Sequence, residues 1–428
     1  MFFFALLLSS LLNDIIMKTQ GGSIMKKFLK SIVLVLVSVI VILQTGCFIK
    51  KHNTIDKSDK TQSAQIENKD NKTIPSYKDD ITCFSRNYLL SREEQKLYDV
   101  IYYSMINGET SIAFSSLSGK FDSRDEMKEM LSNAVYSVIR DHPQLFMYSG
   151  AYTYEFASDL SMSSVVITPK TEMDFETAQK MQKEIDEVAD KLILEIKDMD
   201  DYNKSKYIYT YIAQNTMYNN ADNAHDMYGC LVEGISVCEG YSKAYSYIMQ
   251  KCGIPVAYIS GVADGELHAW NIVKIDGKWY HVDCTWGDPV IEIEDPSERQ
   301  LYVDYAYLHL TTDNIKINHI IDDFYLNIPV CDSIEANYHV KEGVYLESYT
   351  EKSLINVIKN KINDAANLTE KMTISIKYAT PGDVEKANAW LESGKIKETV
   401  NNVQYRTFSY SWSFSDVGTV IIELLFKI

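Results

Sequence analysis

The stretch HAWNIVKIDGKWYHVDCTW, residues 268–286, constrains the fold more than any other part of this chain. Two apolar and aromatic runs flank Asp276-Gly277, and an Asp-Gly pair in this setting is the strongest short-range sign of a β-hairpin. With a two-residue loop, Ile275 faces Lys278 across the hairpin. The sequence therefore predicts two antiparallel strands with a defined register.

This register brings a histidine and an acid to the same face of the predicted hairpin. Asp283 faces Trp270, and His268 shares a face with Trp270 because strand side chains alternate. Asp283 is then the diagonal neighbour of His268, about 7–8 Å away at the backbone, and a carboxylate can reach an imidazole nitrogen over that distance. We expect an oriented histidine; the alternative is a surface histidine and a separate acid that never meet.

A helix is predicted to begin near Cys238. Ser236 or Val237 would cap its start, which places Cys238 in the first turn, and Gly253 ends it. Amides without partners and the helix dipole both favour an anion at such a position. Cys238 is therefore a candidate nucleophile, although a cysteine on an apolar stripe is also a common small core residue. The stripe of period 3.6 comprises Tyr241, Ala244, Tyr245, Ile248, Met249 and Cys252.

Three segments resemble, in this order, the transglutaminase-like superfamily of papain-type thiol enzymes in its bacterial secreted branch. They are YGCLVEGISV (228–237), CEGYSKAYSYIMQKCGIP (238–255) and HAWNIVKIDGKWYHVDCTWGDP (268–289). The resemblance implies an α+β fold with a papain-like core, in which a helix carrying the cysteine packs on an antiparallel sheet carrying the histidine and the aspartate. It implies that Cys238 is the nucleophile, His268 its base and Asp283 the acid that orients the base.

The similarity to bacterial members extends upstream, but two positions depart from the pattern. The upstream matches are LSREEQKLYDVI (90–101), DHPQLFMY (141–148) and YIYTYIAQNTMYNN (207–220). The helix before the core often reads IHDYL in such proteins, whereas residues 208–212 here read IYTYI, and Gly287 stands where a second acid is usual. Neither position belongs to the triad, so the departures affect the expected substrate preference more than the expected chemistry.

These residues predict thiol-dependent acyl transfer. A thiolate attacks the carbonyl of a protein or peptide amide and leaves an acyl-enzyme thioester, so the chain is expected to be a transglutaminase-like cysteine protease or acyltransferase that cross-links, deamidates or cleaves its substrate. The amide of Cys238 can stabilise the oxyanion, and Gln214, Asn215 and Tyr218 are candidates for a second donor that also read as solvated or packing residues. The alternatives are a non-catalytic adhesion or scaffold module of the cell surface, or a peptidase acting on cell-wall peptides.

The N-terminus is expected to export the chain. Lys26, Lys27 and Lys30 precede the apolar run 31–43, and Cys47 follows in a lipoprotein-like cleavage box, which predicts a signal peptide over 25–47 with a lipid on Cys47. An uncleaved signal anchor is the alternative. Residues 1–24 are interpreted as a mis-assigned start. We therefore expect a lipoprotein on the extracellular face of the cell membrane.

The rest of the chain divides by composition and periodicity. Residues 48–80 are polar and are predicted to be a flexible linker. Residues 81–195 mix helix-like and strand-like runs, as an N-terminal α+β domain or as an extension of the core. Residues 196–325 are predicted to hold the catalytic domain, and 335–428 a small C-terminal α/β domain without a catalytic constellation.

The net charge and the spacing of the cysteines limit the classes of partner and ligand that the chain is expected to bind. The net charge is −17 over 428 residues, and no basic stripe is present, which argues against a nucleic-acid partner. No two of the seven cysteines are spaced as a metal pair, and Cys284, which points away from Asp283, is expected in the core. The charged loop from Ile291 to Arg299 could hold a cation, but we expect it to be solvated. The sequence thus predicts no metal and no cofactor, a protein or peptide substrate, and contact with the membrane through the lipid.

Overall fold

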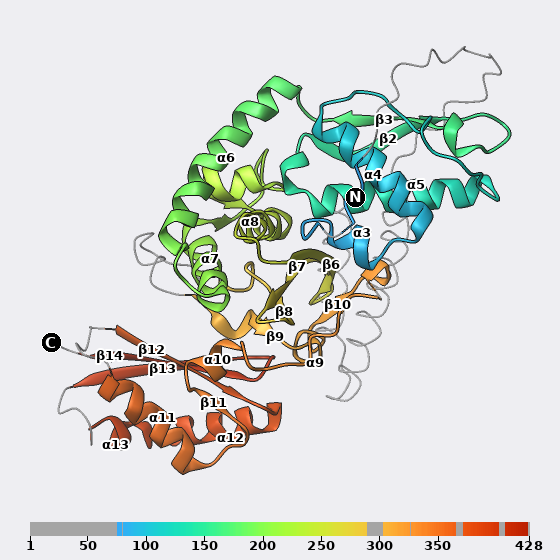
Figure 1. The fold of residues 1–428 in the computed structure, drawn as a ribbon. Coiled ribbons are helices and arrows are strands. Elements are labelled where there is room, and N and C mark those ends of the chain that lie inside the picture. Colours follow the sequence, from blue (N-terminus) through green and yellow to red (C-terminus); the bar gives the residue numbers. More distant parts are fainter. Residues whose placement is uncertain are drawn as a thin grey trace, which may run out of the picture.

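The computed structural model describes residues 75–78, 80–288, 303–325, 327–364, 371–401 and 407–426. The predicted start, signal peptide and lipidated Cys47, nearly all of the predicted linker, and the loop 291–299 lie outside these residues. Within the described ranges, no helix has the length and apolar character needed to cross a membrane. Figure 1 shows helices and strands mixed throughout, so the predicted α+β class is confirmed.

The N-terminal part combines helices with a small antiparallel sheet in the order β1-β3-β2. Helix α4 begins with a capping box, in which Ser91 accepts from the amide of Glu94 while the Glu94 side chain accepts from the amide of Ser91. The elements are α3 (Phe84–Tyr88), α4 (Arg92–Ile106), β1 (Ile112–Ala113), α5 (Arg124–Asp141), β2 (Tyr148–Glu155) and β3 (Val166–Thr171).

Three helices lead into the central part: α6 (Phe175–Ile196), α7 (Asp201–Asn215) and α8 (Cys238–Lys251). A single hydrophobic cluster runs from Cys83 to Ala336 and includes residues on both sides of position 196. The N-terminal part therefore packs as a continuation of the central core. Between α7 and α8, the short strands β4 (Met217–Tyr218) and β5 (Ile235–Ser236) pair in parallel.

The central sheet is antiparallel, with strand order β10-β6-β7-β8-β9. Strands β7 and β8 form the predicted hairpin, and Ile275 faces Lys278 as expected. Asp276 and Gly277 both have positive φ, of 49° and 83°, which is the backbone that a tight two-residue hairpin loop requires. The strands are β6 (Val256–Ala263), β7 (Glu266–Ile275), β8 (Lys278–Val282), β9 (Leu308–Leu310) and β10 (His319–Ile321).

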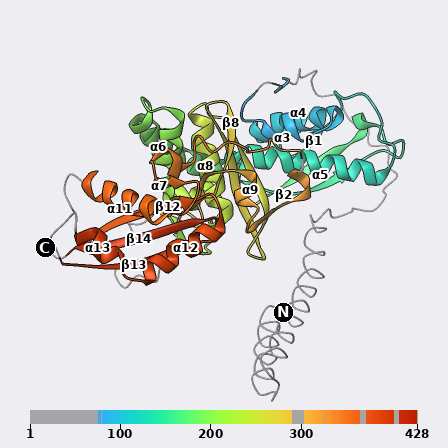
Figure 2. The same ribbon diagram turned by 90° about the horizontal axis from the view of Figure 1, so that it is seen from below.

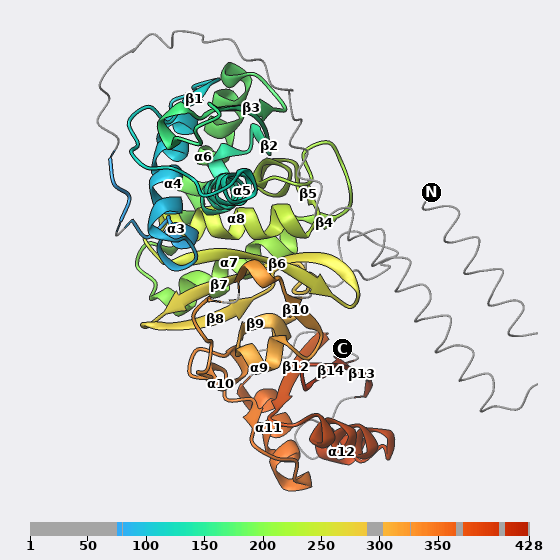
Figure 3. The same cartoon turned by 90° about the vertical axis from the view of Figure 1, so that its right-hand side faces the viewer.

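The two faces of this sheet contact different parts of the molecule. Val273 and Ile275 point toward α8 and belong to the large cluster. Trp270 and Ile272 alternate with them and pack on the other side, in a second cluster that contains Tyr325. Figure 3 shows α8 lying along the sheet, with α9 (Thr312–Ile315) and α10 (Tyr338–Lys341) on the side toward the C-terminal part.

The C-terminal part is a four-stranded sheet, order β11-β12-β14-β13, with helices against it and its own hydrophobic cluster. Figure 2 shows it beside the central part. Val417, in the turn between β13 and β14, is buried in the cluster of the central sheet instead. The elements are β11 (Tyr345–Leu346), α11 (Glu351–Asp364), β12 (Lys371–Tyr378), α12 (Pro381–Glu392), α13 (Ile396–Asn401), β13 (Phe408–Ser415) and β14 (Thr419–Phe426).

Candidate active site

Cys238 is the first residue of α8, as the sequence predicts. Its N-cap is Val237, whose side chain cannot accept a hydrogen bond, so the first-turn amides remain available to an anion at the thiol. The side chain is partly exposed rather than buried with the apolar stripe below it. A Cβ at Gly240 would collide with the carbonyls of Ala224 and Asp226, so this glycine lets the preceding loop lie against the helix start.

His268 and Asp283 meet as the hairpin register predicts. His268 Nε2 lies 2.7 Å from Asp283 Oδ2. Burial by itself lowers the pKa of His268, but the charge and hydrogen bond of Asp283, with a hydrogen bond to Cys238, raise it to about 10. Burial by itself would raise the pKa of Asp283, but His268 and a hydrogen bond from His319 hold it well below its usual range. The pair is therefore a buried imidazolium and carboxylate.

The imidazole of His268 connects Cys238 with Asp283 through hydrogen bonds to both side chains. Because Nε2 of His268 is bonded to Asp283, the nitrogen left for the hydrogen bond with Cys238 is Nδ1. Among the six described cysteines all are free, so no disulfide engages the Cys238 thiol, and Cys284 is buried in the core as expected. The structure thus brings together the three residues that the sequence singles out.

Tyr218 joins the site from β4. Burial raises the pKa of its hydroxyl, and so do the nearby Cys238 and Asp283; hydrogen bonds connect the hydroxyl to both the side chain and the backbone of Cys238. Of the three residues considered as oxyanion donors, Tyr218 is therefore at the nucleophile, whereas the Asn215 amide donates to the carbonyl of Tyr211 within its own helix.

His319 belongs to the site although no pattern in the sequence selects it. Its Nε2 lies 3.1 Å from Asp283 Oδ2, the same oxygen that His268 contacts, and its side chain is fully buried. It comes from the short strand β10, 36 residues beyond Asp283, where no motif or helical or strand periodicity marks it. Only the pairing of β10 with β6 brings it near.

The same three residues could be considered as metal ligands, because atoms of His268, Asp283 and His319 lie within 4.8 Å of one another, a grouping found once in the described part of the chain. However, both imidazoles hydrogen-bond the carboxylate directly, at 2.7 and 3.1 Å. A cation would need a lone pair on each of these nitrogens, but both nitrogens carry the protons that they donate to the carboxylate. We therefore interpret the cluster as a hydrogen-bond network.

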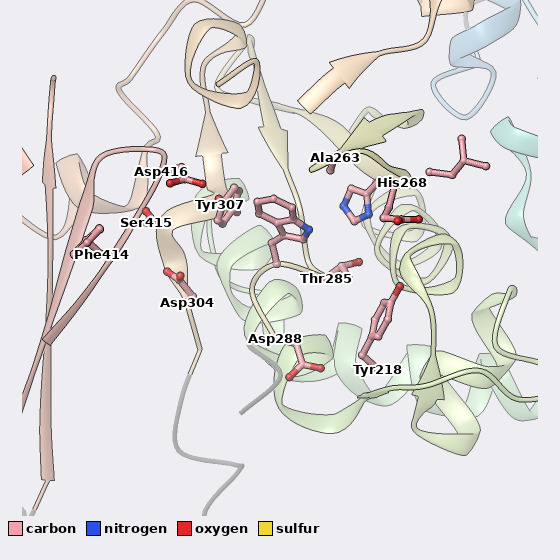
Figure 4. Close-up of a pocket in the computed structure, with 13 residues that line it drawn as sticks. Tyr218, Ala263, His268, Thr285, Asp288, Asp304, Tyr307, Phe414, Ser415 and Asp416 are labelled. Carbon is pink, nitrogen blue, oxygen red and sulfur yellow. The ribbon is translucent and has the colours of Figure 1, made fainter. Parts of the chain in front are cut away.

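A cleft of about 540 Å³ opens beside His268. Figure 4 shows His268, Thr285 and Tyr218 on one side of it and Phe414, Ser415 and Asp416 of the C-terminal part on the other. None of its described lining residues is Lys or Arg, whereas four are acidic. The lining residues are Tyr218, Ala263, Glu266, Leu267, His268, Thr285, Trp286, Asp288, Asp304, Tyr307, Phe414, Ser415 and Asp416.

The two departures from the family pattern lie against each other. A Cβ at Gly287 would overlap the ring of Tyr209, whose hydroxyl donates to the carbonyl of Asp304 at 2.6 Å. Tyr209 stands where the pattern has histidine, and Gly287 where it has an acid. The larger residue at one position is thus accommodated by the smaller one at the other, and neither hydrogen-bonds the carboxylate of Asp283.

Comparison with known proteins finds a family match over the part of the chain that contains these residues. The model of the transglutaminase-like superfamily matches residues 190–284, a range that contains Cys238, His268 and Asp283. The chain carries a transglutaminase-like domain. Kyphoscoliosis peptidase of Mus musculus is 26% identical to it over 83 residues, which cover 17% of this chain. The aligned part is 13% of the length of that relative.

Solved structures are also similar over part of the chain. One, described as a TGase, has a TM-score of 0.25 and 16% identity, and covers 34% of this chain and 46% of its own. Another, the periplasmic domain of TgpA from Pseudomonas aeruginosa bound to ethylmercury, has a TM-score of 0.21 and 15% identity, and covers 31% of this chain and 62% of its own.

Proposed function

We propose that the protein is a thiol-dependent acyltransferase or protease that acts on protein or peptide amides through Cys238, His268 and Asp283. The observation that carries this proposal is the 2.7 Å contact between His268 and a fully buried Asp283, together with the hydrogen bond between the same imidazole and Cys238. An imidazole held between an acid and a thiol is the geometry that activates a cysteine nucleophile.

The reaction follows from these positions. The sulfur of Cys238 forms a bond to the substrate carbonyl carbon, and the carbonyl electrons move onto the oxygen. When the carbon–nitrogen bond breaks, His268 gives its proton to the leaving amine, which leaves a thioester on Cys238. His268 then takes a proton from water or from an incoming amine as that group attacks the thioester carbon, and the carbon–sulfur bond breaks to restore the Cys238 thiolate. Water gives proteolysis or deamidation, and an amine gives cross-linking.

Two groups can donate to the oxyanion once the hydrogen bond that joins them in the free enzyme is broken. The amide of Cys238 lies at the start of α8, where the helix dipole favours negative charge. The Tyr218 hydroxyl contacts the backbone and thiol of the same residue. We propose that Tyr218 turns from the thiol to the oxyanion as the sulfur becomes bonded to substrate, so that Tyr218→Phe lowers kcat by roughly 10²-fold, in the range of other oxyanion donors.

The test uses a mixture of peptide and protein amides, with products read by mass spectrometry. Cys238→Ala should remove all turnover and the covalent thioester, and His268→Ala nearly all turnover. Asp283→Asn should leave a remnant, with a loss that reaches roughly 10⁴-fold in triads of this kind. Cys252→Ala, a partly buried thiol at the other end of α8, is the matched control and should be fully active. Full turnover in Cys238→Ala would rule the proposal out.

We further propose that the enzyme works at the outer face of the cell membrane, held by a lipid on Cys47. This rests on the basic and apolar leader that precedes Cys47 in the sequence. Metabolic labelling with a fatty acid should mark the wild-type chain and not Cys47→Ser, and the unlabelled variant should leave the membrane fraction. Label that persists in Cys47→Ser would contradict the anchor without affecting the proposed chemistry.

A further inference from the structure

The carboxylate of Asp283 receives four hydrogen-bond donors, two on each oxygen. Oδ1 accepts from the backbone amides of Thr285 and Trp286, at 3.0 and 3.1 Å. Oδ2 accepts from His268 at 2.7 Å and from His319 at 3.1 Å. Because an ionised carboxylate accepts only, and has about four lone-pair directions, both imidazoles must donate and the acid is fully satisfied.

The fourth donor is built into the fold. Strand β10 pairs with β6, with His319 opposite Ala263 and Ile321 opposite Gly261. A Cβ at Gly261 would overlap the carbonyl of Ile320, so the glycine permits this close approach of the two strands. His319 is thereby brought over the face of the sheet that carries His268, at a ring-centroid distance of 5.4 Å.

The His319 ring is itself held from several directions. Its Nδ1 lies 2.7 Å from Oδ1 of Asn318, and the Asn318 amide nitrogen donates to the Tyr307 hydroxyl at 2.9 Å. The ring also packs against Trp270 and Trp286, with centroids 5.0 and 4.7 Å apart. A side chain fixed in this way at both nitrogens can impose its position on the carboxylate that it contacts.

We infer that His319 is a positioning residue of the active site, which holds Asp283 Oδ2 in place so that the acid keeps the His268 imidazole directed at Cys238. This inference rests on the proposed function and deepens it. Without His319, Oδ2 would keep a single donor, and the buried carboxylate could rotate about the two backbone amides that remain on Oδ1. The imidazole would then spend less time in line with the thiol.

Two substitutions separate hydrogen bonding from packing. His319→Gln keeps an N–H group near the Nε2 position but loses the ring, whereas His319→Phe keeps a ring among the tryptophans but loses the donor. We expect His319→Phe to lower kcat by roughly 10–100-fold with KM unchanged, by analogy with the loss of residues that orient catalytic histidines. His319→Gln should retain most of the wild-type kcat. Ile320→Ala, the exposed neighbour on β10, is the control and should behave as wild type.

A second measurement does not depend on knowing the substrate. The rate at which iodoacetamide alkylates Cys238 at fixed pH, read by peptide mass mapping, reports how well His268 supports the thiolate. The rate should fall in His319→Phe and stay near wild type in His319→Gln. If His319→Phe does not fold, Asn318→Ala replaces it, since it frees Nδ1 and should also slow alkylation.

The outcomes are distinct. If His319→Phe supports alkylation and turnover at least as well as His319→Gln does, the ring acts by packing and the inference is wrong. Where Asn318→Ala replaces His319→Phe, a wild-type alkylation rate in Asn318→Ala would also overturn the inference. If alkylation of Cys238 is unaffected even by His268→Ala, the thiol and imidazole do not cooperate and the proposed function itself fails. Slower alkylation in His319→Phe with no turnover on any amide would support the positioning role while leaving the substrate to be found.

Discussion

At the scale of single residues, the site depends on how buried polar groups are satisfied. Asp283 is completely buried and remains an anion because four donors surround it. Two opposing effects act on the pKa of His268: burial lowers it, and the nearby Asp283 carboxylate and Cys238 thiol raise it. The imidazole is therefore protonated because the effects of Asp283 and Cys238 together exceed that of burial.

This balance predicts the titration of His268. In the wild type its pKa of about 10 lies above the ordinary 6.5, so its contribution to stability is complete below about pH 6.5 and is lost as the pH rises toward 10. Asp283→Asn removes the charge and leaves burial, which lowers the pKa. NMR of the labelled imidazole should then show His268 neutral at pH 7. An imidazolium in this variant at pH 8 would mean that Asp283 is not what holds the proton.

At the scale of elements, one hairpin fixes the acid and base, and one helix end fixes the nucleophile. The register of β7 and β8 follows from Asp276-Gly277, because only a residue pair that tolerates positive φ closes the loop in two residues. The start of α8 follows from its apolar stripe and from the lack of a helical pattern before it. Both signals are local, which is why the sequence was sufficient to predict them.

What the sequence did not reveal depends on contacts between distant segments. His319, 36 residues after Asp283, reaches this acid only because β10 pairs with β6, and no motif marks β10 in the sequence. Tyr218 could be named as a candidate but not placed, since its position depends on the parallel pairing of β4 with β5. Tyr209 and Gly287 each differ from the family pattern, and nothing in the sequence indicated that these two residues pack against each other.

Inserting one residue between Asp276 and Gly277 tests the role of the hairpin. The insertion shifts the register by one, which turns Asp283 to the opposite face of the sheet from His268. We expect alkylation of Cys238 and turnover to collapse while the far-ultraviolet circular dichroism is largely kept. Gly277→Asn, which tolerates positive φ, preserves the register and should remain active. An active insertion variant would show that the hairpin does not set the acid–base pair.

Gly261→Ala tests the approach of β10 to β6. The added Cβ overlaps the Ile320 carbonyl, so β10 must move away and carry His319 with it. Activity should fall as in His319→Phe, and the two substitutions combined should lose no more than either alone, because they act on one contact. Additive losses would mean that Gly261 affects the site by another route. Gly253→Ala is not a suitable comparison, because its φ of 75° adds strain of its own.

At the scale of the whole molecule, the cleft is made by two parts of the chain. The C-terminal part has its own hydrophobic cluster, yet the turn between its last two strands is buried in the central part through Val417. Lys377 of β12, itself buried, donates to the Val417 carbonyl. Burial lowers the pKa of Lys377 to about 8, against the opposite influence of Asp304 in the cleft. The neighbouring Phe414, 60% exposed, is left facing the cleft.

The C-terminal part thereby forms one wall of the cleft, and we expect this wall to contribute to substrate binding. Lys377→Met removes the bond that holds the turn while the C-terminal cluster stays intact, so the wall should loosen without disturbing Cys238. KM for peptide substrates should rise severalfold, alkylation of Cys238 should stay at the wild-type rate, and calorimetry should resolve two unfolding transitions. Lys371→Met, at the exposed end of the same strand, is the matched control and should leave KM unchanged. If the C-terminal part only stabilised the fold, Lys377→Met would change the melting temperature but not KM. An unchanged KM in this variant would therefore show that the C-terminal part does not contribute to substrate recognition.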